Sequence, residues 1–370
     1  AAADTTVSLN QAGVYTLRLS ASDGVSNVSD ETTITVNAPP PPNTAPAWSG
    51  NPIAEANATE DAAYASTLAD NASDAESNPL TFAKVSGPAW LSVAANGALS
   101  GTPSNSDVGA NSFTVSVSDG IAPAVETTLN ITVINSNDAP TWTVNPINGA
   151  NATEDAAYTG SIAGNAADVD ADASLSFVKV SGPAWLSVSA NGALSGTPSN
   201  GDVGSNNFTV SVSDGIAAPV NATLNITVVN TNDTPAWTVN PMNATNATED
   251  AAYTGSIAGN ATDEDAGATL TFAKVSGPDW LNVSPTGAIS GTPGNGNVGL
   301  NSFTVSVSDG IAAAVSATLN ITVINTNDAP TWIVNPIAGV DATEDAVYSG
   351  SIAGSAVDAD PGASLTYAKV

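Results

Sequence analysis

Apolar and polar residues alternate along long stretches of this chain. Residues 113–118 read Phe-Thr-Val-Ser-Val-Ser, and residues 129–134 read Leu-Asn-Ile-Thr-Val-Ile. A period of two places successive side chains on opposite faces of a β-strand. Turn-forming pairs such as Asn96-Gly97 and Asp119-Gly120 separate the alternating runs, and no stretch shows the 3.6-residue period of an amphipathic helix. The pattern therefore predicts short antiparallel strands joined by tight turns.

This strand pattern recurs with a period of about 95 residues. The interval is marked by two series of tryptophans, namely Trp48, Trp142, Trp237 and Trp332, and Trp90, Trp185 and Trp280. Such a period is too long for a solenoid unit and suits one small domain. We therefore predict three complete repeats, at residues 44–138 (repeat 1), 139–233 (repeat 2) and 234–328 (repeat 3). Residues 329–370 are predicted to be the N-terminal part of a fourth repeat.

Residues 1–37 differ from the repeats but share the pattern of their second halves. They contain GVYTLRLSASDG and then TTITVN, where the repeats have NSFTVSVSDG and then LNITVIN. We interpret them as the C-terminal half of an Ig-like sandwich domain, followed by a Pro-rich linker at residues 38–43. Both ends of the chain then fall inside domains, which indicates a segment of a longer protein.

The strand content of each repeat predicts the fold class. About seven short strands with turns between them are typical of a two-sheet Greek-key sandwich. The fold class is therefore all-β, with tandem Ig-like β-sandwich domains in a linear array. The core of repeat 1 is expected to contain Trp90, Leu91, Leu99 and Phe113, together with the apolar residues of the alternating strands.

Composition excludes several classes of function. The 370 residues include no Cys and no His, and five basic residues stand against 35 acidic ones, for a net charge of -30. Disulfides, thiolate chemistry and a histidine base are therefore absent. The strong negative charge argues against nucleic acid as a partner, and no apolar run is long enough for membrane insertion. No catalytic constellation is apparent, so we predict that the chain is not an enzyme.

Acidic residues occupy fixed places in every repeat. Each repeat opens with Ala-Thr-Glu-Asp, continues with two acidic residues separated by one residue, and then, where complete, has Ser-Asp-Gly and a closing Asn-x-Asn-Asp. In repeat 1 the opening pair is Glu60-Asp61 and the closing residues are Asn135, Asn137 and Asp138. Because Cys and His are missing, an all-oxygen site for a hard cation is the natural common partner, and Ca²⁺ fits best.

This ordered set of motifs resembles the cadherin repeat. The stretches Gly-Pro-x-Trp-Leu and Gly-x-Leu/Ile-Ser-Gly-Thr-Pro are more similar to the dystroglycan-type and Ig-like cadherin-like repeats of bacterial surface proteins. The resemblance covers residues 44–370. It implies cadherin-like sandwich domains with Ca²⁺ between consecutive domains, where the ion stiffens each junction.

The resemblance also implies a ligand set for each junction. Between repeats 1 and 2 the implied ligands are Glu60, Asp107, Asn135, Asn137, Asp138, Asp168, Asp170 and Asp214. Between repeats 2 and 3 they are Glu154, Asp202, Asn230, Asn232, Asp233, Asp263, Asp265 and Asp309. After repeat 3 they are Glu249, Asn325, Asn327, Asp328, Asp358 and Asp360.

The chain departs from the cadherin pattern in several places. Asn stands where the cadherin linker opens with Asp, and the acidic Asp-Arg-Glu motif is reduced to one Asp or, at Asn297, to none. Fewer carboxylates imply weaker binding, so the junction after repeat 3 is expected to bind Ca²⁺ more weakly than the one before it. The linker before repeat 1 has Thr44 in place of the Asp, and no comparable site is expected there.

Simpler interpretations of these residues stay open. The Asn-Asp-Ala-Pro segments also suit linker turns, Asp-Gly suits hairpin turns, and surface carboxylates keep a long fibre soluble. The rare Lys84, Lys179, Lys274 and Lys369 follow an aromatic residue by two positions. They suit either a Lys–Asn isopeptide crosslink or a side chain that reaches out from a strand end.

Together these features predict a non-enzymatic structural or adhesive segment of a long extracellular, cell-surface protein, in the form of a Ca²⁺-stiffened stalk or filament. The expected partners are other copies or adjacent domains of the same protein, and cell-surface glycans or proteins. Two alternatives are an array of modules that bind glycans or a partner, and a spacer within a giant secreted enzyme.

Overall fold

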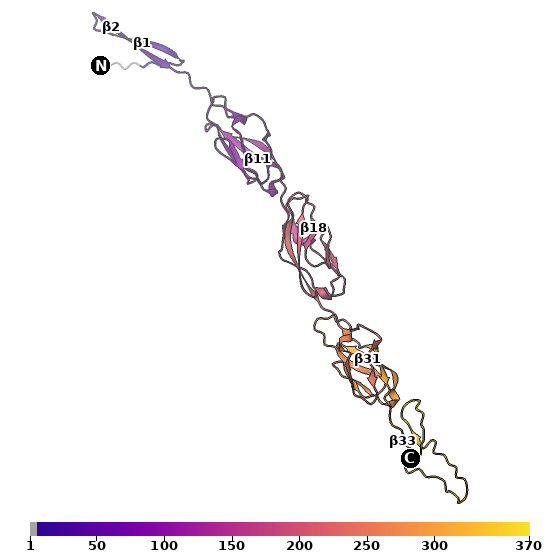
Figure 1. Ribbon diagram of the computed structural model, residues 1–370. Coiled ribbons are helices and arrows are strands. Elements are labelled where there is room, and N and C mark those ends of the chain that lie inside the picture. The colour runs from indigo at the N-terminus through magenta and orange to yellow at the C-terminus, as the bar shows by residue number, and fades with distance from the viewer. Residues whose placement is uncertain (1–5) are drawn as a thin grey trace. The chain divides into compact units, whose positions relative to one another are not determined.

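The structure is a computed structural model that describes residues 6–370. The described residues contain no α-helix, and their helical turns are six three-residue 3-10 helices (Figure 1). The predicted all-β class is therefore confirmed. Residue contacts divide the chain into two compact units, which we describe separately. The first extends to Ala139 and includes Asp168–Ala173, and the second holds Pro140–Ala167 and Ser174–Val370.

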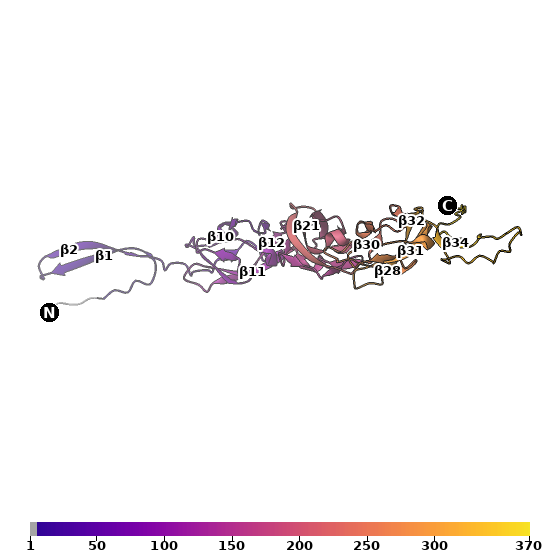
Figure 2. The ribbon, with the colours of Figure 1, turned by 60° about the horizontal axis from the view of Figure 1, so that its bottom comes forward.

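Repeat 1 is a sandwich of a larger and a smaller sheet. Its elements are β3 (Ala47–Trp48), β4 (Ile53–Ala54), β5 (Ala58–Thr59), β6 (Tyr64–Thr67), η1 (Ala69–Asn71), β7 (Ala72–Ser73), β8 (Thr81–Ser86), β9 (Leu91–Val93), β10 (Ala98–Gly101), η2 (Asn105–Asp107), β11 (Gly109–Ser118) and β12 (Val125–Ile134). The larger sheet has the order β4-β12-β11-β8, with β5 also on β12, and the smaller has the order β6-β10-β9. Figure 2 shows β10 and β11 in separate layers.

Repeats 2 and 3 have the same topology as repeat 1. The elements of repeat 2 are β13 (Thr141–Trp142), β14 (Ile147–Asn148), β15 (Ala152–Thr153), β16 (Tyr158–Ser161), η3 (Ala163–Asn165), β17 (Ala166–Ala167), β18 (Ser176–Ser181), β19 (Leu186–Val188), β20 (Ala193–Gly196), η4 (Asn200–Asp202), β21 (Gly204–Ser213) and β22 (Val220–Val229). Those of repeat 3 are β23 (Ala236–Trp237), β24 (Met242–Asn243), β25 (Ala247–Thr248), β26 (Tyr253–Ser256), η5 (Ala258–Asn260), β27 (Ala261–Thr262), β28 (Thr271–Ser276), β29 (Leu281–Val283), β30 (Ala288–Gly291), η6 (Asn295–Asn297), β31 (Gly299–Ser308) and β32 (Val315–Ile324).

Each complete repeat has its own hydrophobic core between the two sheets. In repeat 1 the expected core residues Leu91, Leu99 and Phe113 are buried, and Trp90 packs against them while remaining partly exposed. The indole N–H of Trp90 donates to Oδ1 of Asn111 at 3.0 Å, and its ring meets Phe113 edge-on. The buried positions of β11 and β12 alternate with more exposed ones, as the period of two predicts.

The recurring position of Lys84, two residues after Phe82, also has a structural basis. Its Nζ donates to the carbonyl oxygens of Pro88 and Leu91 at 2.7 and 2.8 Å and lies 5.9 Å from the ring centre of Phe113. The ammonium therefore fastens the Gly-Pro-x-Trp-Leu loop to the core. Lys179 and Lys274 make the same contacts in repeats 2 and 3.

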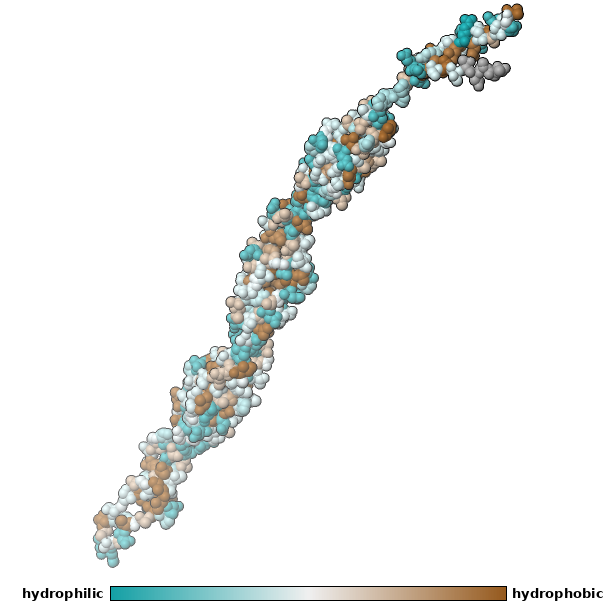
Figure 3. Space-filling view, turned by 180° about the vertical axis from the view of Figure 1, so that it is seen from behind, coloured by the Kyte–Doolittle hydropathy of each residue, from teal (hydrophilic) through white to brown (hydrophobic). Residues whose placement is uncertain are grey.

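The two end segments pair strands without building a core. The hairpin of β1 (Gly13–Ser22) and β2 (Asn27–Val36) pairs over its whole length, yet Val14 and Leu19 are 69% and 66% exposed. Near the C-terminus, β33 (Thr331–Trp332) pairs with β34 (Ala356–Val357), and Trp332 is exposed. Brown hydrophobic residues accordingly gather at the surface of both segments (Figure 3). Among residues 6–370, no helix has the length and hydropathy needed to cross a bilayer.

Candidate metal centres at the repeat junctions

The glutamate that opens repeat 1 is carried to the far end of the domain. Strand β5 runs parallel to β12, and the backbone N–H of Glu60 donates to Ile134 O at 3.0 Å, where β12 ends. Glu60 is 1% exposed. Its Oε2 accepts a hydrogen bond from Ser136 N at 3.4 Å, whereas its Oε1 is buried without a hydrogen-bond partner. A buried carboxylate oxygen without a partner is costly unless a cation or a proton meets it.

Two aspartates meet this glutamate at the end of repeat 1. Asp138 N donates to Asp170 Oδ2 at 2.8 Å, and Asp170 N in turn donates to Asp168 Oδ1 at 2.9 Å. One carboxylate oxygen each of Glu60, Asp138 and Asp170 lies within 4.8 Å of the others. Asp168 lies beside this group, and its Oδ2 is also buried without a partner. Three of the predicted residues thus form a compact oxygen cluster.

The second unit contains two further clusters of this kind. Glu154, Asp233 and Asp265 repeat the first arrangement, and Glu154 is 2% exposed with an unpartnered Oε1. The third cluster joins Glu249 and Asp328 to Asp250. Sequence reasoning did not choose Asp250, one carboxylate oxygen of which lies within 4.8 Å of oxygens of Glu249 and Asp328. Asp360 contacts this cluster by accepting a hydrogen bond from Asp328 N at 2.8 Å.

The single Asp that replaces the Asp-Arg-Glu motif serves the local backbone instead. Oδ2 of Asp107 accepts hydrogen bonds from N and Oγ of Ser104 at 2.9 and 2.8 Å, which caps η2. Asp202 caps η4 through Ser199 in the same way. At the equivalent place in repeat 3, Asn297 Oδ1 accepts from Gly294 N at 3.1 Å. None of these side chains belongs to the three clusters found in the described residues.

The aspartates of the Ser-Asp-Gly loops order their own turns. Oδ1 of Asp309 accepts the N–H groups of Ile311 and Ala312, both at 2.9 Å, while Oδ2 accepts from Asn232 Nδ2 at 2.7 Å. The bond from Ile311, and then that from Asn232, lowers the pKa of Asp309 below its usual value. Asp214 accepts the corresponding backbone bonds in repeat 2.

The predicted linker asparagines present their amide nitrogens to the junction. Nδ2 of Asn135 donates to Asp170 Oδ1 at 2.8 Å, and Asn230 and Asn325 make the same bond to Asp265 and Asp360. Those of Asn137, Asn232 and Asn327 donate to the carbonyl oxygen of the aspartate that follows.

A further asparagine was missed by sequence reasoning. Asn105 opens η2, and its Nδ2 reaches Asp170 Oδ1 at 3.4 Å. Asn200 and Asn295 bond to Asp233 and Asp328 at 2.9 and 2.7 Å. The recurrence of Asn two residues after each Thr-Pro was the available signal.

The start of repeat 1 is built from the same loops with different side chains. Thr44 occupies the place of the linker aspartate, and its N and Oγ1 donate to the carboxylate of Glu76 at 3.2 and 2.6 Å. These bonds lower the pKa of Glu76, the hydroxyl having the largest effect. Asn43 Nδ2 donates to Asp119 Oδ2 at 2.7 Å. Each carboxylate here is thus bonded to a neutral donor.

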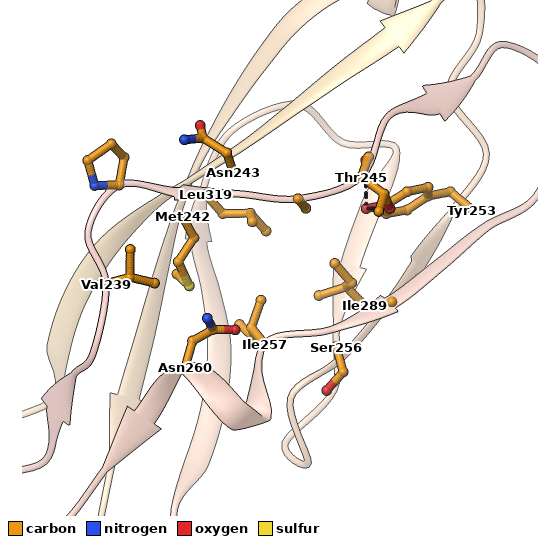
Figure 4. A pocket seen from close by; sticks show the side chains of 13 residues that line it. Val239, Met242, Asn243, Thr245, Tyr253, Ser256, Ile257, Asn260, Ile289 and Leu319 are labelled. Carbon is orange, nitrogen blue, oxygen red and sulfur yellow. Dashed lines mark hydrogen bonds between the residues drawn. The ribbon is translucent and has the colours of Figure 1, made fainter.

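Repeats 2 and 3 each contain a cavity at the equivalent place on the side of the sandwich, away from the junctions. In repeat 3 it measures about 560 Å³ and in repeat 2 about 480 Å³. Met242, Ile257 and Leu319 form its apolar floor, and Asn243 and Asn260 lie at its rim (Figure 4). In repeat 1 the side chains of Ser66 and Glu55 meet across this position at 2.5 Å. At the matching positions repeat 2 has Gly149 and Gly160, and repeat 3 has Ala244 and Gly255. These smaller residues leave the cavity open.

These features define a protein of tandem Ig-like sandwiches with an acidic cluster where one repeat meets the next. The chain belongs to the He_PIG family, described as "Putative Ig domain", which matches residues 41–134, 140–229 and 235–324. A search among curated proteins gave no match.

Solved structures show the same fold in cadherin ectodomains. Domains 1–5 of protocadherin gamma B2 are 14% identical, with a TM-score of 0.59, over 85% of this chain and 67% of that one. Domains EC22–24 of mouse cadherin-23 are 18% identical, with a TM-score of 0.55, over 77% of this chain and 100% of that one. At such identities the likeness concerns the fold alone.

An endo-fucoidan hydrolase of glycoside hydrolase family 107 is also similar in sequence. The two are 31% identical over 77% of this chain, with a TM-score of 0.29. The match covers 45% of the length of the hydrolase. A superposition this poor carries no functional argument.

Proposed function

We propose that this chain is a structural or adhesive segment of an extracellular, cell-surface protein, and that Ca²⁺ at its repeat junctions stiffens it. The proposal gives the chain no catalytic role. Its partners would be adjacent domains or other copies of the same protein, and glycans or proteins at a cell surface.

One observation is the main support for a metal site at the repeat junctions. Glu60, Glu154 and Glu249 are each almost fully buried, and each keeps one carboxylate oxygen without a hydrogen-bond partner beside two further acidic residues. A protein that buries a charged oxygen in this way three times, always at a repeat end, needs a positive partner there. Within residues 6–370, the one ion pair is that of Arg18 with Glu31 in the N-terminal hairpin, so no Lys or Arg neutralises these clusters.

The donor set favours Ca²⁺ among the common cations. Every side chain of the clusters offers oxygen, which suits hard cations and not the softer metals that prefer Cys or His. In the second unit, Glu154, Asp233 and Asp265 would hold the ion, with Asp263 beside them. Ligands from the end of one repeat, the linker and the start of the next would restrain the joint between them, since moving the repeats apart would break coordination.

The test is a calorimetric titration of the full chain with Ca²⁺ after treatment with chelator. Glu154→Gln removes one charge from one cluster and should weaken binding at that junction by roughly 10- to 100-fold. The matched control is Glu126→Gln, which removes a charge from β12 away from the clusters and should leave every site intact. No binding heat from the wild type, or equal loss in both variants, would contradict the proposal. Small-angle scattering with and without chelator then measures the stiffening.

The shared cavity supports a second candidate, a module that binds a glycan or partner. Its lining mixes aliphatic side chains with amide and hydroxyl groups, as ligand pockets do. A glycan array would test it with the full chain and with a variant that combines Gly149→Glu and Gly160→Ser with Ala244→Glu and Gly255→Ser, which copies the Glu55–Ser66 contact of repeat 1 into both repeats. Binding that is absent, or unchanged in the variant, would remove this candidate.

A further inference from the structure

The junction asparagines face the acidic clusters with their nitrogen atoms. Between repeats 2 and 3, Nδ2 of Asn230 lies 2.7 Å from Asp265 Oδ1, and Nδ2 of Asn200 lies 2.9 Å from Asp233 Oδ2. The third carboxylate, that of Glu154, accepts from the backbone N–H of Thr231 at 3.2 Å. Each carboxylate of this cluster is therefore held through an N–H group of the protein.

The same supports recur at the other junctions. Asn135 and Asn325 donate to Asp170 and Asp360, and Asn105 and Asn295 donate to Asp170 and Asp328. These bonds connect residues 33 to 65 positions apart, and they join the loop at the end of one repeat to the linker or to the next repeat. A hydrogen bond to a charged acceptor is stronger than one between neutral groups.

The start of repeat 1 supplies independent support. There Pro41 stands where Asn230 stands in the later junction, so no amide is available. The second donor to the acidic residue comes from Thr44 Oγ1 instead, at 2.6 Å from Glu76. Where one side-chain donor is missing another takes its place, which indicates that the carboxylate needs a donor whatever else it binds.

We propose that Asn230 and its equivalents are positioning residues, which hold the acidic side chains of a junction together and keep it ordered with no metal ion present. The inference deepens the proposed function and rests on it, because these carboxylates are those of the proposed ion site. Donated N–H groups offset part of the repulsion among carboxylates that lie within a few ångströms. Both oxygens of Asp265 accept such bonds, whereas at Glu154 the bond from Thr231 engages Oε2 and leaves Oε1 to face an ion.

The two possible roles of Asn230, positioning residue and direct ligand, lead to different expectations for a junction without ions. Only a positioning residue should keep the junction ordered there. The reporter is the backbone N–H of Asp233, which donates to Asp265 Oδ2 at 2.8 Å across the linker. We would follow its hydrogen–deuterium exchange, residue by residue, in the full chain with chelator. Asn230→Ala should speed exchange of this amide about tenfold, the typical effect of one lost hydrogen bond.

Two controls and one reporter of folding keep the result specific. Within the same variant, the N–H of Asp138, which makes the equivalent bond to Asp170 with Asn135 intact, should exchange as in the wild type. Asn225→Ala removes an amide on β22 whose bond goes to Asn148 and should leave Asp233 unchanged. The indole N–H of Trp237, bonded to Val315 O inside repeat 3, reports that the domain remains folded.

Each outcome decides the matter. Equal exchange of Asp233 in the wild type and in Asn230→Ala, with chelator present, would overturn the positioning role. A variant that weakens only Ca²⁺ binding would mark Asn230 as a ligand and would overturn it as well. A chain that binds no Ca²⁺ but shows the Asn230-dependent protection would refute the proposed function and leave this inference standing.

Discussion

The start of repeat 1 and the junction of repeats 2 and 3 use one backbone arrangement with opposite chemistry. In both, a linker N–H donates to an acidic residue of the following repeat: Thr44 N to Glu76, and Asp233 N to Asp265. In both, an asparagine bonds to the aspartate of the Ser-Asp-Gly loop. They differ at the side chain of residue 44 or 233, which is a hydroxyl donor in one and a carboxylate in the other, and at residue 41 or 230, which is Pro in one and Asn in the other.

These differences change which groups satisfy the carboxylates of each region. The Thr44 hydroxyl donates a hydrogen bond to the carboxylate of Glu76, in addition to the one from its backbone N–H. The carboxylate side chain of Asp233 has no such hydroxyl donor. It adds a further acidic group beside those of Asp265 and the buried Glu154. Both oxygens of Glu76 therefore accept a hydrogen bond at the start of repeat 1, although Asp74 Oδ2 nearby is buried without a partner, and the second arrangement leaves an oxygen of the almost fully buried Glu154 without one.

The largest effect is expected when the second arrangement is converted into the first. Asp233→Thr removes one of three clustered carboxylates and adds a donor that bonds to Asp265. Ca²⁺ affinity at this junction should fall roughly 100-fold, because affinity follows the number of charged ligands. Calorimetric titration of the full chain measures it, and the neighbouring junctions serve as internal references.

Asp233→Asn is the matched control for that substitution. It removes the charge but keeps the shape and an oxygen, so its loss should be smaller than that of the threonine variant. If the two variants bind Ca²⁺ as tightly as the wild type does, residue 233 is not what distinguishes the two regions.

The reverse change, Thr44→Asp, should not create a matching site. Within residues 6–370, clusters of three acidic oxygens are found only at the three later junctions, so Thr44 has no counterpart of the buried Glu154 beside it. The variant loses the hydroxyl donor and sets a carboxylate against Glu76, so we expect the pKa of Glu76 to rise and exchange of the residue 44 amide to accelerate about tenfold. Carboxyl NMR titration and hydrogen exchange measure the two effects. Tight Ca²⁺ binding by this variant would show that the buried glutamate is dispensable.

Sequence alone was sufficient for the fold because its signals are local and repeated. The period of two in residues 113–118 becomes the alternating burial of β11, and Trp90 and its equivalents mark each core at a constant interval. The acidic residues Glu60, Asp138 and Asp170 were selected through the cadherin resemblance, and their convergence follows from the parallel pairing of β5 with β12.

The remaining details depend on where each side chain finds its nearest donor. Asp107 has the sequence position of a ligand, but Ser104 three residues earlier gives it a capping box, and the local bonds hold it there. Asp250 belongs to its cluster, whereas Asp61 and Asp155 do not belong to theirs although they have the same left-handed φ of 54°. The orientation of an asparagine amide is likewise set by its neighbours in space, as at Asn105 and Asp170.

The capping geometry of Asp202 leads to the prediction of a smaller effect on Ca²⁺ affinity. Asp202 and Asn297 occupy equivalent places, and the sequence suggested that this difference would weaken the junction after repeat 3. Both side chains accept a hydrogen bond from the backbone of the residue three positions earlier, so Asp202→Asn should change Ca²⁺ affinity at its junction by less than about threefold. The same titration checks it against Asp233→Asn. A loss as large as in that control would return Asp202 to the ligand set.

The smallest expected effect is on the pKa of the aspartate in the Ser-Asp-Gly loop, of which each compared region has one. Hydrogen bonds lower the pKa of both Asp119 and Asp309 below 3.8. The main cause at Asp119 is the Asn43 amide, whereas at Asp309 it is the backbone N–H of Ile311, followed by the Asn232 amide. Because a lowered carboxylate pKa stabilises the folded state above the unfolded value, this contribution is present above pH 3.8 and is lost as the pH falls through the lower folded value.

Asn43→Ala should therefore raise the pKa of Asp119 more than Asn232→Ala raises that of Asp309. Carboxyl NMR titration of the full chain in chelator measures both, with Asp23, whose pKa is lowered by its own turn, as the internal reference. In acid, the turn that Asp119 holds through the N–H groups of Ile121 and Ala122 should then weaken at a higher pH in the Asn43 variant than in the wild type. Equal shifts at the two aspartates would mean that the linker amides contribute alike, and that these two bonds do not distinguish the two regions.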